Sequence, residues 1–192
     1  MRNKKKIVVY IMIISILLIF TGTLYVQINS SLQVKSVNVD IREYGIGWTF
    51  EEFKSLYEYV NETEDKDYQL IRQENVFPSE DKNDYCGITI WAKIKNRSFL
   101  DVNVYNTYIV DEDVNSPIIK ASTEISEDFG NFEEVEEFCV IAFDMYRGDM
   151  TDEEILEYIK TLKLEVYYGN TIDRNSTLKL DLKDYDVKLS DR

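Results

Sequence analysis

The sequence predicts a mostly β protein, in which an N-terminal transmembrane helix precedes an Ig-like antiparallel β-sandwich with two inserted α-helices. Three observations predict this fold. A long apolar stretch follows a basic cluster at the N-terminus, apolar and polar residues alternate through much of the remaining chain, and two segments with helix-entry signals interrupt that alternation. An α+β fold, with one antiparallel sheet covered by both helices, is the alternative.

The N-terminal stretch has the length of a membrane anchor. The uncharged residues from Ile7 to Val26 would reach roughly 30 Å as a helix, at about 1.5 Å per residue, which matches the hydrocarbon core of a bilayer. The small-x-small site of a cleavable signal peptide does not follow it. We therefore expect an uncleaved signal anchor, with a cleaved signal peptide as the alternative.

The residues that flank this stretch predict its orientation. Lys4, Lys5 and Lys6 precede it, and basic residues favour the cytoplasmic side of a membrane. Tyr10 and Tyr25 lie near its two ends, where an amphipathic ring suits the membrane interface. We expect residues 1–28 to form a cytoplasmic basic cluster and a transmembrane signal anchor, and residues 29–192 to form one extracytoplasmic β-rich domain at the cell membrane.

The predicted domain is strongly acidic. All 36 acidic side chains but only 18 of the 22 basic ones lie in it, which gives a formal charge of −18. Such a surface repels phosphate backbones, so we expect no nucleic-acid partner, and it would attract a basic protein. The low Pro and Gly content, with abundant Ile, Lys, Asn and Glu, favours a bacterial source with an AT-rich genome.

Alternation with a period of two predicts the strands. The clearest pattern is "YCGITIWAKIKN", and "FCVIAFDMY" predicts a central strand with Cys139 and Ile141 on one face and Val140 on the other. Residues 162–168 and 178–183 read as a hairpin around the polar loop "GNTIDRNST". Weaker strand patterns cover residues 32–41, 68–76, 100–110 and 118–125.

Two segments carry residue patterns that are typical of helix N-termini. Thr49 and Glu52 have capping-box spacing, and Trp48 with Phe53 has the spacing of a hydrophobic staple. The segment "MTDEEILEYIKTL" repeats both signals, with Thr151 and Glu154 as the box and Met150 and Ile155 as the staple. We expect both helices to dock an apolar face on the sheet. The second would be either a parallel crossover or a bridge between two sheets.

Two cysteines, Cys86 and Cys139, fall in the domain predicted to lie outside the membrane. An oxidising compartment permits one disulfide between them. Because both lie in apolar strand patterns, two buried free thiols are the alternative.

The residue inventory excludes several chemistries. Without histidine, the chain has no Ser-His-Asp or Cys-His nucleophile and no imidazole zinc ligand. Hydrolysis by two carboxylates remains, and Asp144 in "IAFDMY" is the one acid placed inside an apolar strand pattern. We expect Asp144 to face solvent or to bond at a sheet edge, and we predict no catalytic, cofactor-binding or metal-binding residue.

Three further motifs have simple explanations. We expect Arg147-Gly148-Asp149 to be a turn before a capped helix rather than an adhesion signal. Two polar loops offer oxygen ligands for Ca²⁺ but fit solvated turns better. Their residues are Asp111, Glu112, Asp113 and Asn115 in one loop, and Asp173, Asn175 and Thr177 in the other. The sequons at Asn61, Asn96 and Asn175 would be coincidental in a bacterial protein.

These observations predict a non-catalytic module, tethered to the membrane, that binds a protein, a peptide or an envelope polymer outside the cell membrane. Two alternatives remain. One is an inhibitor or immunity-type protein that caps a basic partner, and the other is an envelope hydrolase that acts through carboxylates.

Overall fold

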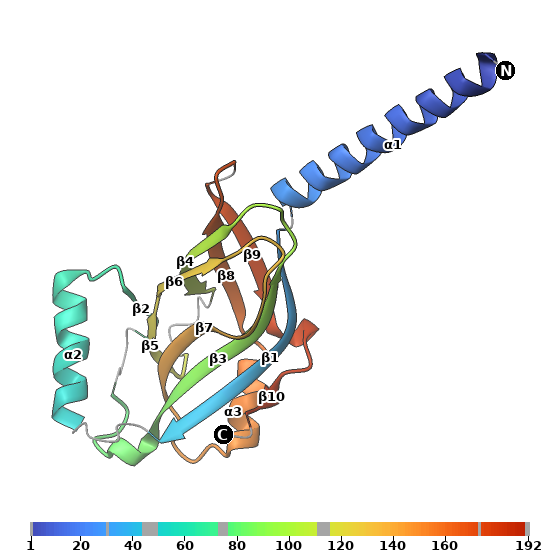
Figure 1. The fold of residues 1–192 in the computed structure, drawn as a ribbon. Helices are drawn as coiled ribbons and strands as arrows, with labels where there is room; N and C mark the ends of the chain where they lie inside the picture. Colours follow the sequence, from blue (N-terminus) through green and yellow to red (C-terminus); the bar gives the residue numbers. More distant parts are fainter. Residues whose placement is uncertain are drawn as a thin grey trace.

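The computed structural model describes residues 2–29, 31–43, 50–72, 77–110, 116–172 and 174–190. The protein is mostly β, as the alternation predicts, and one apolar helix precedes two sheets that share a hydrophobic core (Figure 1). Among the described residues the helices are α1 (Arg2–Asn29), α2 (Phe50–Thr63) and α3 (Asp152–Ile159). The strands are β1 (Leu32–Glu43), β2 (Tyr68–Leu70), β3 (Tyr85–Asn96), β4 (Val102–Ile109), β5 (Ile118–Ser122), β6 (Glu124–Phe129), β7 (Glu134–Tyr146), β8 (Lys163–Gly169), β9 (Ser176–Asp181) and β10 (Lys188–Leu189).

The larger sheet has the strand order β10-β1-β3-β7-β5-β2, and the smaller has the order β6-β4-β8-β9. Every described pairing is antiparallel except that of β1 with β10. The predicted hairpin is confirmed, because Lys163 pairs with Asp181 and Tyr168 with Ser176. The strands thus fall into two sheets, so the alternative of one sheet covered by two helices is not what the structure shows.

The predicted strand 118–125 divides at Thr123 into β5 of the larger sheet and β6 of the smaller. Thr123 is fully buried, its Oγ1 donates to the carbonyl of Lys66 at 2.6 Å, and its backbone nitrogen donates to Asp67 at 2.8 Å. These bonds satisfy the polar groups that a change of sheet would otherwise leave without partners inside the protein. Alternation alone does not reveal this change of sheet, because both halves of the segment are extended.

A β-bulge in β7 places Cys139 on the face of the sheet opposite to the predicted one. Ile90 pairs with Ile141 but Trp91 pairs with Cys139, so Val140 is the extra residue. Val140 and Ile141 are both fully buried, and Cys139 moves to the opposite face of the sheet beside Trp91. The prediction that Cys139 shares a face with Ile141 is therefore wrong, because one inserted residue reverses the alternation beyond it.

α3 connects β7 in the larger sheet with β8 in the smaller, which is the bridging arrangement. The predicted capping box is present: the Glu154 nitrogen donates to Thr151 Oγ1 at 3.2 Å, and the Thr151 nitrogen donates to Glu154 Oε2 at 2.9 Å. Ile155 and Ile159 on one side of the helix are fully buried in the shared core. The helix therefore joins and covers the two sheets at one end.

α2 docks on the outer face of the larger sheet through aromatic rings. Phe50 and Tyr57 stand edge-on to Phe77, with ring centroids 5.5 and 5.4 Å apart, and Tyr85 of β3 stands edge-on to Tyr146 of β7 at 5.6 Å. This cluster covers one end of the outer face and leaves the rest of it open. The predicted cap and staple residues Thr49 and Trp48 lie outside the described residues, as does the Phe53 side chain.

The buried side chain of Asn96 joins the chain segments that pass between the sheets. Its Nδ2 donates to the carbonyls of Leu100 at 2.8 Å and Gly130 at 2.9 Å, and its Oδ1 accepts from the Ser98 nitrogen at 2.9 Å. The side chain is fully buried, so each bond replaces one that water would otherwise make. The amide thereby fixes the β3–β4 and β6–β7 connections together, and as a sequon residue it is closed to glycosylation in the folded domain.

Replacing this amide should destabilise the domain far more than replacing an exposed one. Asn96→Ala removes the bonds to Leu100, Gly130 and Ser98 and leaves the buried Ser98 nitrogen without its acceptor, so we expect a loss of about 2–3 kcal/mol in the free energy of unfolding. Asn103→Ala is the matched control, because that amide makes a solvent-exposed hydrogen bond to Asp128, and its loss should stay below about 1 kcal/mol. Urea unfolding of the full chain in detergent, followed by Trp fluorescence, measures both, and equal losses would contradict this role of Asn96.

Candidate functional site

The open part of the outer face of the larger sheet presents a row of side chains that crosses four strands. Arg42 of β1 pairs with Gly87 of β3, Gly87 pairs with Asp144 of β7, and Asp144 pairs with Lys120 of β5. Residues directly opposite one another on neighbouring strands share a face. The strand pairing thus brings two cations and one carboxylate, from residues far apart in the sequence, into a single line.

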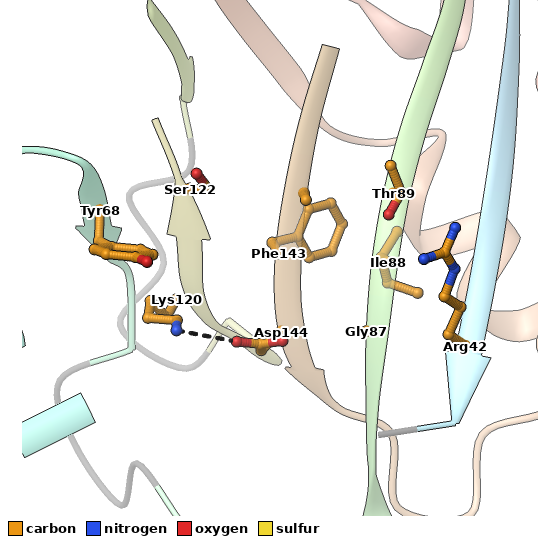
Figure 2. A pocket seen from close by; sticks show the side chains of 10 residues that line it. Arg42, Tyr68, Gly87, Ile88, Thr89, Lys120, Ser122, Phe143 and Asp144 are labelled. Atoms are coloured by element: carbon orange, nitrogen blue, oxygen red, sulfur yellow. Dashed lines mark ion pairs between the residues drawn. The ribbon is translucent and has the colours of Figure 1, made fainter. Parts of the chain in front are cut away.

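A second row runs beside the first. Asp40 pairs with Thr89, Thr89 with Ala142, Ala142 with Ser122, and Ser122 with Tyr68. All residues of the two rows except Asp40 line a concavity of about 250 Å³, which Figure 2 shows from close by. The hydroxyl groups of Thr89, Ser122 and Tyr68 add donors and acceptors to its charged groups.

The hollow exists because the middle of each row is small. Gly87 has no side chain, and Ala142 has only a methyl group, whereas Arg42, Lys120 and Tyr68 stand at the edges. A Cβ atom built on Gly87 would meet no other atom within 4 Å, so the space above this glycine is open. Because the centre of the row is the sheet backbone, the floor of the concavity is rigid.

An ion pair forms one wall of the concavity. Lys120 Nζ lies 3.4 Å from Asp144 Oδ2 and 4.7 Å from the centre of the Tyr68 ring (Figure 2). The Lys120 side chain is only 8% exposed and that of Asp144 21%, so both charges are largely removed from water. Burial raises the pKa of Asp144 above its usual value, although the neighbouring ammonium of Lys120 acts to lower it.

Arg42 at the opposite wall is more accessible. Its guanidinium donates through Nε to Asp40 Oδ2 at 2.7 Å, while the Arg42 side chain remains 59% exposed. Two cations therefore face the concavity together with the carboxylate of Asp144, and the carboxylate of Asp40 pairs with Arg42 beside it. With its charges balanced in this way, the concavity is suited to a polar group that offers both donors and acceptors.

This arrangement differs from that of a two-carboxylate hydrolase. Asp144 is the only acid that lines the concavity among the described residues. A second hollow, of about 390 Å³, lies between the end of α2 and β2 and includes Glu64 and Asp65. These two are adjacent in the chain, and the Asp65 carboxylate accepts from the Asp67 nitrogen in a turn, whereas a glycosidase needs two acids that flank a bond, about 5–10 Å apart.

Both cysteines carry free thiols in the structure. Cys86 pairs with Met145, six residues along β7 from Cys139, a separation of roughly 20 Å at about 3.3 Å per residue. A disulfide needs Cα atoms within about 7 Å, and the bulge places the two thiols on opposite faces. The described fold therefore does not accommodate the disulfide that the sequence permits. Burial raises the pKa of Cys86 to about 12, and it also raises the pKa of Cys139.

The other motifs noted in the sequence, the Arg-Gly-Asp segment and the two polar loops, do not line the concavity. Arg147 donates to the carbonyl of Met150 at 3.0 Å and to Asp152 at 3.1 Å, and Gly148 has a φ of 49°, so the Arg-Gly-Asp segment is a turn before α3, as predicted. Residues 111–115 and Asp173 of the two polar loops lie outside the described residues. Within the part of the chain that the structure describes, no group of three or more Cys, Asp or Glu residues could hold a metal ion.

α1 contains the predicted anchor segment as one continuous helix. Its residues Ile7–Tyr25, 19 in number, are apolar enough to cross a membrane, and Tyr10 and Tyr25 are both exposed near the ends of that segment. Lys4, Lys5 and Lys6 belong to the first turns of the helix, and their side chains lie outside the description. Figure 1 shows the helix projecting away from the two sheets.

Comparison with protein-family models, with curated proteins and with solved structures finds no match to this chain. The sequence singled out Asp144 but predicted that it faces solvent or bonds at a sheet edge. That prediction is wrong, because Asp144 lies on the inner strand β7, largely buried and paired with Lys120. Arg42, Lys120 and Tyr68 were missed. Lys120 in "IIKAS" had the same signal as Asp144, namely a lone charge inside an apolar strand.

The free thiols can be counted directly. In the native chain at pH 8 we expect both cysteines to react slowly with Ellman's reagent, because their burial disfavours the thiolate. After unfolding in guanidinium without reductant, both should react at once. A chain that shows no reactive thiol after unfolding would instead contain the disulfide.

Removing the cation from the buried ion pair should cost stability in a pH-dependent manner. Lys120→Met leaves the Asp144 carboxylate without its partner, so we expect a loss of about 2 kcal/mol at pH 7. The raised pKa of Asp144 in the folded state means that its protonated form is favoured there, so stability is lost as pH rises through that pKa. The deficit of Lys120→Met should therefore shrink as pH falls toward 4.

Two control variants accompany this measurement. Lys120→Met with Asp144→Asn removes both charges and should recover most of the loss at pH 7. Lys160→Met removes one partner of the exposed Lys160–Glu157 pair, which should change stability by less than about 0.5 kcal/mol. Urea unfolding at pH 4 and pH 7 gives the values, and a loss that is independent of pH would contradict the assignment to Asp144.

Proposed function

We propose that this chain is a membrane-anchored binding module. In this proposal α1 is retained as a single-pass anchor in the cell membrane, with the N-terminus in the cytoplasm. The two-sheet domain then lies on the outer side as a non-catalytic, Ig-like sandwich. Its ligand is a peptide segment or a unit of an envelope polymer.

The concavity over Gly87 is the observation that carries this proposal. It combines a rigid sheet floor, the Lys120–Asp144 pair, the exposed guanidinium of Arg42 and several hydroxyl groups. Binding sites for small groups combine such fixed polar groups with a preformed hollow. Because charges of both signs line it, it favours an uncharged polar segment, such as an extended peptide backbone or a sugar unit.

A second candidate function rests on the acidic edge of the smaller sheet. β6 is an edge strand on which Glu124, Glu127 and Asp128 are all exposed. Such an edge suits a basic protein, as an inhibitor or immunity-type module would require, and binding to it should weaken as salt screens the charges. Salt sensitivity separates this candidate from the first, which depends on local hydrogen bonds.

Filling the concavity should abolish ligand binding and leave the fold intact. Gly87→Val places a β-branched side chain in the open space above the sheet, and Thr177→Val places the same side chain at an exposed position of β9, away from both candidate surfaces, as a matched control. The full chain in nanodiscs is incubated with solubilised envelope proteins and with sheared cell-wall polymer, at low and high salt. We expect the components retained by the parent chain and by Thr177→Val to be at least about tenfold depleted with Gly87→Val.

The other outcomes of this retention experiment distinguish the two candidate functions. Equal retention by all three chains would rule out the concavity as the ligand site. Retention that is lost at high salt in all three would favour the acidic edge and a basic partner. If nothing is retained at either salt concentration, both binding functions are rejected.

A further inference from the structure

The end of the domain next to α1 is built from loops whose positions are fixed by hydrogen bonds. β1 begins at Leu32, three residues after α1 ends at Asn29. The Arg97 nitrogen donates to the carbonyl of Ser31 at 2.6 Å, and the Phe132 nitrogen donates to the carbonyl of Ser98 at 3.1 Å. The β3–β4 and β6–β7 loops therefore lie beside the point where the chain leaves α1.

The turn of the β8–β9 hairpin lies at the same end. Val102 at the start of β4 pairs with Phe129 at the end of β6, and the adjacent Asn103 pairs with Gly169 at the end of β8. The connections that follow Asn96, Phe129 and Gly169 thus leave their strands in the same direction. Figure 1 shows these three loops gathered at the end of the domain from which α1 emerges.

Each of the three loops exposes one large apolar side chain. Phe99, Phe132 and Ile172 are 42%, 58% and 57% exposed. Single exposed apolar residues are common on soluble proteins. Outside α1, however, Phe99 and Phe132 are the only exposed phenylalanines among the described residues, and both occupy this end.

Phe132 is also unusual in its backbone. It has a φ of 56°, in the left-handed region where glycine and asparagine are favoured and where a bulky residue costs energy. The exposed ring makes little contribution to the core, so folding alone does not account for a phenylalanine here. Strain of this kind persists where a side chain has another use.

The chain between the anchor and the domain is short. From Tyr25, at the end of the apolar segment, the helix continues for four residues to Asn29, and three more residues reach Leu32. At about 1.5 Å per helical residue and at most about 3.4 Å per extended residue, Leu32 lies within roughly 16 Å of the hydrocarbon edge. The polar interface occupies the first 5–8 Å or so of that distance, so the short connection holds this end of the domain close to it.

We propose that Phe99, Phe132 and Ile172 form a second membrane contact, in which the three loop tips insert into the interface of the outer leaflet and hold the domain in one orientation on the bilayer. This inference rests on the proposed retention of α1 as an anchor. The driving force is apolar burial rather than attraction to anionic lipid, because Asp101 and Glu133 offset the charges of the exposed Arg97 and Arg174 in the same three loops. The partner is therefore the interface of a zwitterionic bilayer.

The membrane contact would determine the orientation of the domain and the position of the concavity above the bilayer. With its loops on the bilayer, the strands of the larger sheet rise from the membrane, and α2 lies toward the opposite end of the domain (Figure 1). The concavity is formed near the ends of β1 and β3 that are distant from Leu32 and Asn96, since Arg42 pairs with Gly87 there. The ligand site would then be held at a constant height above the lipid surface.

Depth-dependent fluorescence quenching tests this contact in the full chain. Single variants Phe132→Trp, Phe99→Trp, Tyr59→Trp and Tyr10→Trp are placed in nanodiscs of phosphatidylcholine with or without bromine atoms on the acyl chains. The parent chain supplies the background of Trp48 and Trp91. Tyr59 is the matched control, because it is an aromatic residue of α2 with 56% exposure, and Tyr10 reports whether α1 lies in the bilayer.

We expect the added emission of Phe132→Trp and Phe99→Trp to fall about twofold with brominated lipid, that of Tyr10→Trp to fall further, and that of Tyr59→Trp to remain unchanged. Quenching of Tyr10→Trp with none for either loop variant would overturn the second contact and leave the proposed anchor intact. An absence of quenching for Tyr10→Trp would reject the anchor itself, and the loop contact with it. The two loop variants are independent, so one that fails to fold does not prevent the test.

Discussion

The amide of Asn96 is the constraint on which the rest of the domain depends. Chain connections between stacked sheets carry backbone groups that no strand partner satisfies, and they need another source of hydrogen bonds. One buried side chain supplies this to two connections at once, through Leu100, Gly130 and Ser98. Since Arg97 next to it bonds to Ser31, the same network also fixes the start of β1. The relative position of the two sheets and the entry of the chain into the domain thus have a common origin.

The open face of the larger sheet follows from how the other surfaces are covered. One face of that sheet packs in the shared core, and α2 covers part of the other through the aromatic cluster around Tyr85. What remains is a polar surface whose shape is set by side-chain size along two rows, with Gly87 and Ala142 in the middle. A buried ion pair at its edge adds little net stability, since the cost of desolvation offsets the attraction. Its value lies in fixed geometry, which is also what a binding surface requires.

Local patterns predicted the elements of this fold well. The alternation around Ile88 and Ile90 indicated β3, and the capping box of Thr151 and Glu154 indicated α3, because in each case the cause lies within a few residues. The bulge at Val140 could not be predicted in this way, since it depends on which residue of β3 stands opposite. The site shows the same limit. Asp144 and Lys120 each carry a local signal, a charge in an apolar strand, whereas the pairing that brings them together beside Gly87 joins strands over long separations in sequence.

The parallel pairing of β10 with β1 also has a consequence for the order in which the domain is made. Asn38 and Val39 pair with Lys188 and Leu189, and the Ser190 nitrogen donates to the carbonyl of Val39 at 2.7 Å. Synthesis proceeds from the N-terminus, so β1 is made early. The strand that pairs with its outer edge, β10, is made about 150 residues later. During that interval the nascent domain has an unpaired edge, the kind of surface on which β proteins associate with one another. The larger sheet is thus closed at this edge only after residues 188–189 have been made.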